Sequence, residues 1–369
     1  MDARETNITG DAPMTGGRIT GRTEMHGKAV ALFSGGLDST LAVKVMLDQG
    51  IEIEAVNFTS LFCNCNPRKE GCVHQASKAA REFGIPIRVL TKGMEYMRVV
   101  ERPRYGYGRG MNPCTDCRIY MFRKVRELLP EVKASFVVTG EVLGQCSMSQ
   151  HRRAIEIIER ESGLKGLILR PLSARLLPPT VPESEGIVDR PKLLDLAGRS
   201  RKPQMALAGM MGITDYPCPA GGCLLTDGVV AARLRDLFLY NPDYTMTDLH
   251  LLRYGRHFRL DAGLKAVAGR DERENRRIRA LAADGGDAFF RPLNFRGPAV
   301  LARGALNPDM EEKIGRIMAL YSQDTPNGYT IEKKTRGGGQ TMFSVDGGLA
   351  PEIIGQWRVG WDAPEKPRA

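Results

Sequence analysis

The sequence has no apolar run long enough to cross a membrane, because none approaches the roughly 18 residues that a spanning helix needs. Residues 1–26 also lack the apolar core of a secretory signal. They are polar and rich in glycine, threonine and arginine, which predicts a disordered tail. Internal repeats and low-complexity tracts are missing as well. These absences favour a cytoplasmic protein without a membrane partner.

Acidic residues are outnumbered. Lysine and arginine total 53 against 43 aspartate and glutamate residues, which gives a net charge of +10 and a pI near 9.3. A surplus of this size favours a polyanionic partner such as a nucleic acid, and a solvated basic surface is the alternative.

The eight cysteines come without a secretory signal, so we expect reduced thiols rather than a disulfide framework. Their spacing is uneven, and clustering of this kind indicates metal or redox chemistry. The groups are Cys63, Cys65 and Cys72; Cys114 and Cys117; the single Cys146; and Cys218 and Cys223.

Short apolar runs alternate with helical stretches from residue 28 to about residue 169, which predicts an α/β fold whose parallel sheet carries helices on both faces. The length of 369 residues favours two domains. Residues 251–303 contain 12 lysines and arginines against 6 acids, and this shift in composition suggests a second domain. We therefore expect a nucleotide-binding α/β domain over 27–240 and a smaller, basic α+β domain over 241–369.

The sharpest motif is SGGLDST, residues 34–40, which follows a predicted strand and precedes a predicted helix. Gly35 and Gly36 permit a tight turn in which backbone N–H groups approach an anion closely. Hydroxyl groups and the helix N-terminus add to this phosphate-binding character, and the hydroxyls belong to Ser34, Ser39 and Thr40. The lysine of a Walker loop is missing.

This loop resembles the S-G-G-x-D-S signature of the PP-loop ATP pyrophosphatases, which have the adenine nucleotide alpha hydrolase-like fold. The resemblance implies that the chain cleaves ATP to AMP and pyrophosphate and transfers AMP to a carbonyl oxygen. Asp38 would lie beside the phosphates, where it would hold Mg²⁺ or orient the attacking group. A helix-starting carboxylate without chemistry is the alternative for Asp38.

Residues 139–150, TGEVLGQCSMSQ, are similar to the T-G-E-x-L-G-Q…S-Q segment of tRNA 4-thiouridine synthases, with one additional residue. This resemblance, to thiouridine synthases of the ThiI, MnmA and TtuA type, implies further contacts with the nucleotide. They would come from Asn57, Phe58, Arg118, Gly140 and Gln150. We find no rhodanese-type tail with a persulfide cysteine, so the sulfur donor stays open among sulfide, a cysteine desulfurase and a carrier protein.

The segment NPCTDC, residues 112–117, resembles the N-P-x-x-x-C segment of tRNA 2-thiouridylases, whose reactive cysteine matches Cys117. Cys223 is the preferred match for their second cysteine, ahead of Cys218. Two mechanisms stay open. A persulfide relay uses Cys117 and Cys223, whereas a [4Fe–4S] cluster would take Cys114, Cys117 and Cys223 as ligands.

The remaining cysteines have weaker signals. Cys63, Cys65 and Cys72 either bind zinc, with His74 as a fourth ligand, or have no role. Cys146 matches no motif and is expected to be structural.

Residues 267–275, VAGRDEREN, resemble the start of the NFACT-type RNA-binding module. Arginines in this region would contact phosphates, and Tyr254 and Phe258 would stack on bases. The predicted RNA-binding residues are Arg256, Arg259, Arg270, Arg273, Arg276 and Arg277. A solvated helix face of mixed charge is the alternative.

Together these resemblances imply an ATP-dependent tRNA sulfurtransferase that adenylates a uridine carbonyl and replaces its oxygen with sulfur. tRNA and a sulfur donor would be its partners, and a homodimer is an open alternative to a monomer. Two rival functions remain at this point. One is a PP-loop enzyme that sulfurises or amidates a small molecule, and the other is an RNA-binding protein whose PP-loop domain only senses nucleotide.

Overall fold

The computed structural model describes residues 27–63, 72–216, 222–283, 288–335 and 337–360. The predicted tail over 1–26, and the residues Cys65 and Cys218, lie outside these ranges. The chain divides into two compact units between Leu224 and Leu225. Among the described residues, no helix combines the length and apolarity of a membrane span.

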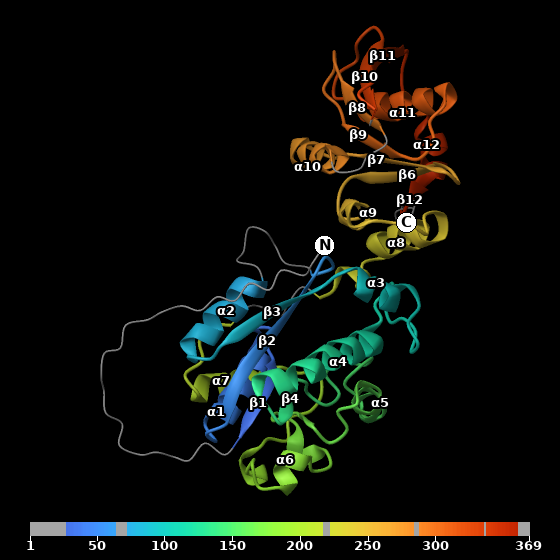
Figure 1. Cartoon of the computed structure of the whole chain (residues 1–369). Coiled ribbons are helices and arrows are strands. Elements are labelled where there is room, and N and C mark those ends of the chain that lie inside the picture. The colour runs from blue at the N-terminus through green and yellow to red at the C-terminus, as the bar shows by residue number, and fades with distance from the viewer. Residues whose placement is uncertain (1–26, 64–71, 217–221, 284–287, 336, 361–369) are drawn as a thin grey trace, which may run out of the picture. The chain divides into compact units, whose positions relative to one another are not determined.

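The first unit is built on a parallel sheet in the order β3-β2-β1-β4-β5 (Figure 1). All four pairings are parallel, as the alternating pattern of the sequence predicts. The strands are β1 (Lys28–Leu32), β2 (Glu52–Ser60), β3 (Ile87–Lys92), β4 (Phe136–Thr139) and β5 (Ile168–Leu169).

Helices cover both faces of this sheet, and the alternation of β1 shows why. Ala29 and Ala31 belong to the core shared with α1 (Leu37–Leu47), α2 (Cys72–Glu82) and α7 (Lys202–Met210). Val30 and Leu32 belong to the core shared with α4 (Cys114–Val132) and α5 (Arg152–Ser162). The predicted parallel sheet with helices on both faces is confirmed. α3 (Met94–Glu101) follows β3, and α6 (Val181–Ser184) is a single turn.

The second unit is a smaller α+β domain, also as predicted. Its antiparallel sheet has the order β11-β10-β8-β9-β7-β6-β12. The strands are β6 (Arg256–Asp261), β7 (Leu264–Ala268), β8 (Ala288–Pro292), β9 (Val300–Arg303), β10 (Tyr329–Thr335), β11 (Gln340–Val345) and β12 (Arg358–Val359). The helices are α8 (Gly228–Tyr240), α9 (Met246–Leu251), α10 (Glu272–Ala283), α11 (Pro308–Leu320) and α12 (Pro351–Trp357).

The helix α8 lies in the second unit, although the composition of the sequence placed the boundary after residue 240. Arg233 of α8 donates hydrogen bonds to the carbonyl oxygens of Leu252 (2.7 Å) and Gly255 (2.8 Å). Asp236, one turn on, accepts hydrogen bonds from Arg259 and Lys265 of the second sheet. These buried polar contacts, which composition does not reveal, bind α8 to the residues that follow it.

Candidate active site

The predicted phosphate loop joins the end of β1 to the start of α1. Gly35 has a φ of +70°, and a Cβ there would lie 2.7 Å from the backbone nitrogen of Ala76, so this position requires glycine. The Ser39 hydroxyl donates to the carbonyl of Gly36 (3.0 Å) and lies 3.1 Å from the Ser34 hydroxyl. The turn thereby leaves the first N–H groups of α1 at a strand end, where parallel sheets bind ligands.

A cavity of about 380 Å³ opens at this loop. Nine of the eleven predicted nucleotide-binding residues line it, and Gly35 and Thr40 are the two that do not. The nine are Ser34, Gly36, Asp38, Ser39, Asn57, Phe58, Arg118, Gly140 and Gln150. Segments far apart in sequence are thus brought to one site, and their contact with ATP remains a prediction.

Gly140 determines how closely β4 approaches the phosphate loop. β4 pairs with β1 through Leu32 and Thr139, so residue 140 leaves the sheet directly beside the loop. A Cβ on Gly140 would lie 2.5 Å from both the carbonyl carbon of Asp38 and the nitrogen of Ser39. Only glycine fits between these two backbone segments.

Asp38 faces the cavity with one carboxylate oxygen engaged and one open. Gln145 donates its Nε2 to Asp38 Oδ2 at 3.0 Å. Oδ1 is buried and has no hydrogen-bond partner among the described residues. An unsatisfied carboxylate oxygen beside a phosphate loop fits a Mg²⁺ ion, which is commonly bound by one or two carboxylates together with substrate phosphates.

Gln145 and Arg201 are among the cavity residues that the sequence reasoning did not assign to the nucleotide. Gln145 belongs to the recognised TGEVLGQ segment, but nothing in the pattern assigned it to Asp38. Arg201 also lines the cavity. It follows a long proline-containing connection without a periodic pattern, so no sequence signal marked it.

A buried charge network supports the wall of the cavity. Glu141 accepts from Arg170 at 3.0 Å and lies 3.2 Å from Arg118 Nε. Arg170 and Glu141 are almost fully buried, with 1% and 2% of their side chains exposed. Burial acts to lower the pKa of Arg118, but Glu141 and the neighbouring thiols outweigh it and raise that pKa. Arg118 is therefore a fixed cation at the edge of the nucleotide cavity.

The three thiols predicted to act together lie around Tyr96, a residue that is only 2% exposed. The Tyr96 hydroxyl hydrogen-bonds Cys117, and burial, Cys117, Cys223 and Cys114 together raise its pKa. Lys92 donates to the Cys117 sulfur at 3.3 Å. This lysine places an ammonium group against the Cys117 sulfur in the first turn of α4.

Cys63 lies directly beside Cys223, although the sequence reasoning placed it in a separate group. The two residues form an isolated antiparallel bridge, and the Leu224 N–H donates to the carbonyl of Phe62 at 2.8 Å. The proposed zinc partners Cys65 and the side chain of Cys72 lie outside the described residues. Within the described part of the chain, no three His, Cys, Asp or Glu side chains are close enough to share one metal ion.

Cys146 belongs to the thiol group, although it matches no motif and was expected to be only structural. It accepts a hydrogen bond from Cys114, and a second from Ser149 with 3.5 Å between oxygen and sulfur. These bonds lower the pKa of Cys146 to about 4 against the opposing effect of burial. The same pairing raises the pKa of Cys114. The bond that Cys114 donates thus favours the deprotonated form of Cys146, beside the C-x-x-C pair.

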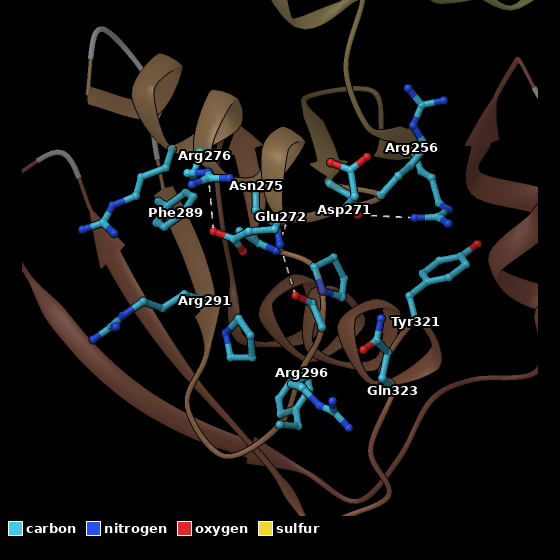
Figure 2. A pocket seen from close by; sticks show the side chains of 18 residues that line it. Arg256, Asp271, Glu272, Asn275, Arg276, Phe289, Arg291, Arg296, Tyr321 and Gln323 are labelled. Atoms are coloured by element: carbon cyan, nitrogen blue, oxygen red, sulfur yellow. Dashed lines mark hydrogen bonds and ion pairs between the residues drawn. The ribbon is translucent and has the colours of Figure 1, made fainter.

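The predicted RNA-binding arginines are divided between different surfaces. Arg256, Arg270 and Arg276 line a pocket of about 630 Å³ in the second unit (Figure 2). Arg273 and Arg277 are exposed on α10 but do not line this pocket. Their contact with RNA remains a prediction.

Arg259 lies on the opposite face of β6 from Arg256 because strand residues alternate. It pairs with Asp236 at 2.8 Å and stacks on Tyr240 at 4.6 Å. Phe258 is fully buried in the core of the second unit, so the prediction that it stacks on RNA bases is wrong. Tyr254 packs half-buried against the neighbouring core cluster.

The chain matches known protein families over two segments. Residues 24–175 match the family described as "Thiamine biosynthesis protein (ThiI)", and residues 255–358 match the "NFACT protein RNA binding domain". Both resemblances expected from the motifs are thereby confirmed.

Curated relatives match part of the chain. The tRNA-specific 2-thiouridylase MnmA of Syntrophotalea carbinolica is 30% identical over 125 residues, which cover 32% of this chain and 35% of the relative. A probable tRNA sulfurtransferase of Methanothermobacter thermautotrophicus is 29% identical over 147 residues, 40% of this chain and 36% of the relative. The chain thus spans about a third of the length of these relatives.

Among solved structures, a 4-thiouridine synthetase–RNA complex with bound ATP is similar with 25% identity and a TM-score of 0.33, over 52% of this chain and 51% of that chain. The C-terminal part of the fibronectin/fibrinogen-binding protein from Streptococcus suis is similar with 14% identity and a TM-score of 0.24, over 66% of this chain and 94% of that chain.

Proposed function

We propose that this protein is an ATP-dependent tRNA sulfurtransferase that adenylates a uridine carbonyl and replaces its oxygen with sulfur. The observation that carries the proposal is the position of Gln145 and Cys146, which are consecutive. Gln145 binds Asp38 in the nucleotide cavity, and Cys146 binds Cys114 of the thiol group. An ATP site and a thiol site are thus joined within one loop, as an adenylation followed by sulfur transfer requires.

In the first step the uridine carbonyl oxygen attacks the α-phosphorus of ATP and pyrophosphate leaves. The backbone N–H groups of the phosphate loop hold the phosphates, and Arg118 balances the negative charge that develops on them. Asp38 would hold a Mg²⁺ ion through its open Oδ1, and the ion would neutralise the phosphate oxygens. Asn57 Oδ1, which is buried and has no partner among the described residues, is available to the nucleotide.

In the second step sulfur attacks the adenylated carbon and AMP leaves. In a persulfide relay, the Cys117 sulfur takes the terminal sulfur from the persulfide of a cysteine desulfurase, whose own cysteine leaves as a thiolate. The terminal sulfur now on Cys117 then forms the new C–S bond. The Cys223 thiolate then attacks the Cys117 sulfur, which releases the thiolated base and leaves a Cys117–Cys223 disulfide for a thiol reductant. Lys92 is placed to stabilise the Cys117 thiolate. The thiols of Cys114, Cys117 and Cys223 also suit iron, and a [4Fe–4S] cluster on them would supply activated sulfide instead.

The test uses anaerobically purified protein with ATP, Mg²⁺ and an unmodified tRNA transcript, with sulfide as the donor in one reaction and a cysteine desulfurase with cysteine in a parallel reaction. AMP is measured by chromatography and the thionucleoside by mass spectrometry after digestion. Asp38→Asn should lose both products, whereas Asp48→Asn on the exposed end of the same helix should lose neither. Cys117→Ala and Cys223→Ala should still form AMP but no thionucleoside.

Retention of the thionucleoside in both cysteine variants would overturn the proposed role of these thiols. If AMP formation does not depend on tRNA but requires a small-molecule acceptor, then that small molecule, and not tRNA, is the substrate. Iron analysis and an absorption spectrum of the same preparation choose between the mechanisms, because only the cluster carries iron. The reaction that yields thionucleoside identifies the class of sulfur donor. Sedimentation distinguishes a monomer from a homodimer, which the sequence leaves open.

A further inference from the structure

The pocket of about 630 Å³ in the second unit lies between α10, β8 and the loops 269–271 and 295–299. Its volume falls in the range of roughly 300–1,000 Å³ that is typical of small-ligand sites. Figure 2 shows Arg276, Phe289 and Arg291 on one side and Arg256 and Tyr321 on the other. Six arginines line the pocket against two acids, Asp271 and Glu272. They are Arg256, Arg270, Arg276, Arg279, Arg291 and Arg296.

The floor of the pocket is fixed before any ligand binds. Asn275 Oδ1 accepts from the Ala299 N–H at 2.9 Å, and its Nδ2 donates to the Gly297 carbonyl at 3.4 Å. The Gly269 N–H donates to the Ala299 carbonyl at 3.0 Å. A Cβ on Gly269 would lie 2.1 Å from Asn275 Oδ1, so the two loops pack against this amide without room for a side chain.

Several of the arginines are held in place by carboxylates beneath them. Glu332 binds Arg291 through both nitrogen positions, and Asp324 binds Arg296 at 2.8 Å. A guanidinium group has five N–H donors, and a carboxylate that binds it in this way uses two. The remaining donors stay oriented for a ligand, so these pairs prepare the site rather than neutralise it fully.

Two arginines of the pocket have no carboxylate partner in the part of the chain that the structure describes. Arg279 is exposed on α10. Arg256 is half-buried, lies 4.3 Å from the centre of the Tyr321 ring and donates to the Gly269 carbonyl at 3.3 Å. Burial and the nearby charges of Arg358 and Arg270 lower the pKa of Arg256. A bound anion would balance this uncompensated charge.

We propose that this pocket binds one unpaired nucleotide of the RNA, with the base against the ring of Phe289 and its flanking phosphates on Arg256 and Arg279. Combined aromatic and guanidinium surfaces are typical of single-stranded RNA recognition, because only an unpaired base offers its face for stacking. The choice of RNA as partner rests on the proposed function. The pocket, its residues and the requirement for an unpaired nucleotide go beyond it.

The experiment measures binding of the full chain to two fluorescent probes, a short single-stranded oligoribonucleotide and a blunt RNA duplex, over a range of salt concentrations. Phe289→Leu keeps an apolar side chain and should weaken single-strand binding by about 5- to 150-fold, the value of one lost base stack. The salt dependence of binding should be the same for Phe289→Leu as for the wild type, because no charge is removed. Arg279→Ala should weaken binding and reduce the salt slope by about 0.7, the value of one lost phosphate contact. Arg273→Ala is the comparison variant, because it removes an exposed arginine of the same helix that the sequence also predicts to bind RNA but that does not line the pocket. It should weaken single-strand binding less than Arg279→Ala does.

Equal effects of Arg279→Ala and Arg273→Ala, together with wild-type binding by Phe289→Leu, would overturn the inference. The inference would also be overturned if the variants lost as much affinity for the duplex probe as for the single strand, because the surface would then bind RNA stems. Thionucleoside formation, measured in parallel, separates the two hypotheses. If the protein thiolates tRNA but the pocket variants bind RNA like wild type, only the inference about the pocket is rejected. If the pocket variants lose RNA binding but the wild-type protein forms no thionucleoside, only the proposed function is rejected. Thermal unfolding verifies that Phe289→Leu is folded. Arg279 is exposed, so Arg279→Ala tests the same pocket with a substitution that does not disturb the core.

Discussion

Replacing Gly140 by alanine should separate nucleotide chemistry from folding. The new Cβ would lie 2.5 Å from the backbone of Asp38 and Ser39, whereas ordinary contact begins at 3.4 Å. The phosphate loop must therefore retreat from β4 by about 0.9 Å, the difference between these distances. Both neighbours are backbone atoms, so no side chain can rotate away. Such overpacking costs about 1–3 kcal/mol of stability. A displacement of about 1 Å near reacting groups can cost about 100-fold in rate.

The assay is the rate of AMP formation from ATP, with chemical unfolding measured on the same preparations. We expect Gly140→Ala to unfold cooperatively but to form AMP about 100-fold more slowly. Gly209→Ala in α7 is the control, because a Cβ there meets nothing within 4 Å. This variant should keep wild-type activity and gain up to about 1 kcal/mol from better helix propensity. Wild-type AMP formation in Gly140→Ala would show that the phosphates do not bind beside this backbone.

Two further predictions concern stability. Glu141→Gln removes one of the two carboxylates that bind the buried guanidinium of Arg170, the other being Glu159, and should cost about 1.5–3 kcal/mol in urea unfolding. Glu131→Gln, which removes an exposed ion pair, should cost at most about 1 kcal/mol, and equal costs would contradict the burial argument. His257 is buried and its pKa lies well below 6.5. Below pH 6.5 the unfolded chain therefore binds a proton that the folded chain does not, and the free energy of unfolding should fall by about 1.4 kcal/mol per pH unit. His257→Gln should remove this decrease between pH 7 and pH 5 in urea titrations, and an unchanged slope would assign it to other groups.

Much of the first unit could be predicted because its signals are local. The glycines and hydroxyls of residues 34–40 specify a turn between a strand and a helix, and the structure has this turn. The apolar runs also specify parallel strands, since crossover helices separate them. The cavity then follows from the general rule that strand ends meet at one edge of the sheet.

The contacts that sequence could not supply are tertiary pairings between distant segments. Nothing local to Cys146 indicates that Cys114 lies beside it, and nothing near Cys63 indicates Cys223. Arg259 shows the same limit in the second unit. The alternating pattern of this strand predicts that Arg259 is exposed and can bind RNA, but Arg259 forms an ion pair with Asp236 on α8.

On the proposed function, the bond between Gln145 and Asp38 would couple nucleotide binding to the chemistry of the thiols. A ligand that draws Asp38 away from Gln145 shifts the residue whose neighbour, Cys146, holds Cys114. Linkage requires that the reverse effect be equal in free energy, so oxidation or sulfur loading of the thiols must alter ATP affinity by the same factor. In the proposed reaction, the state of the thiols would thereby influence when the nucleotide is held.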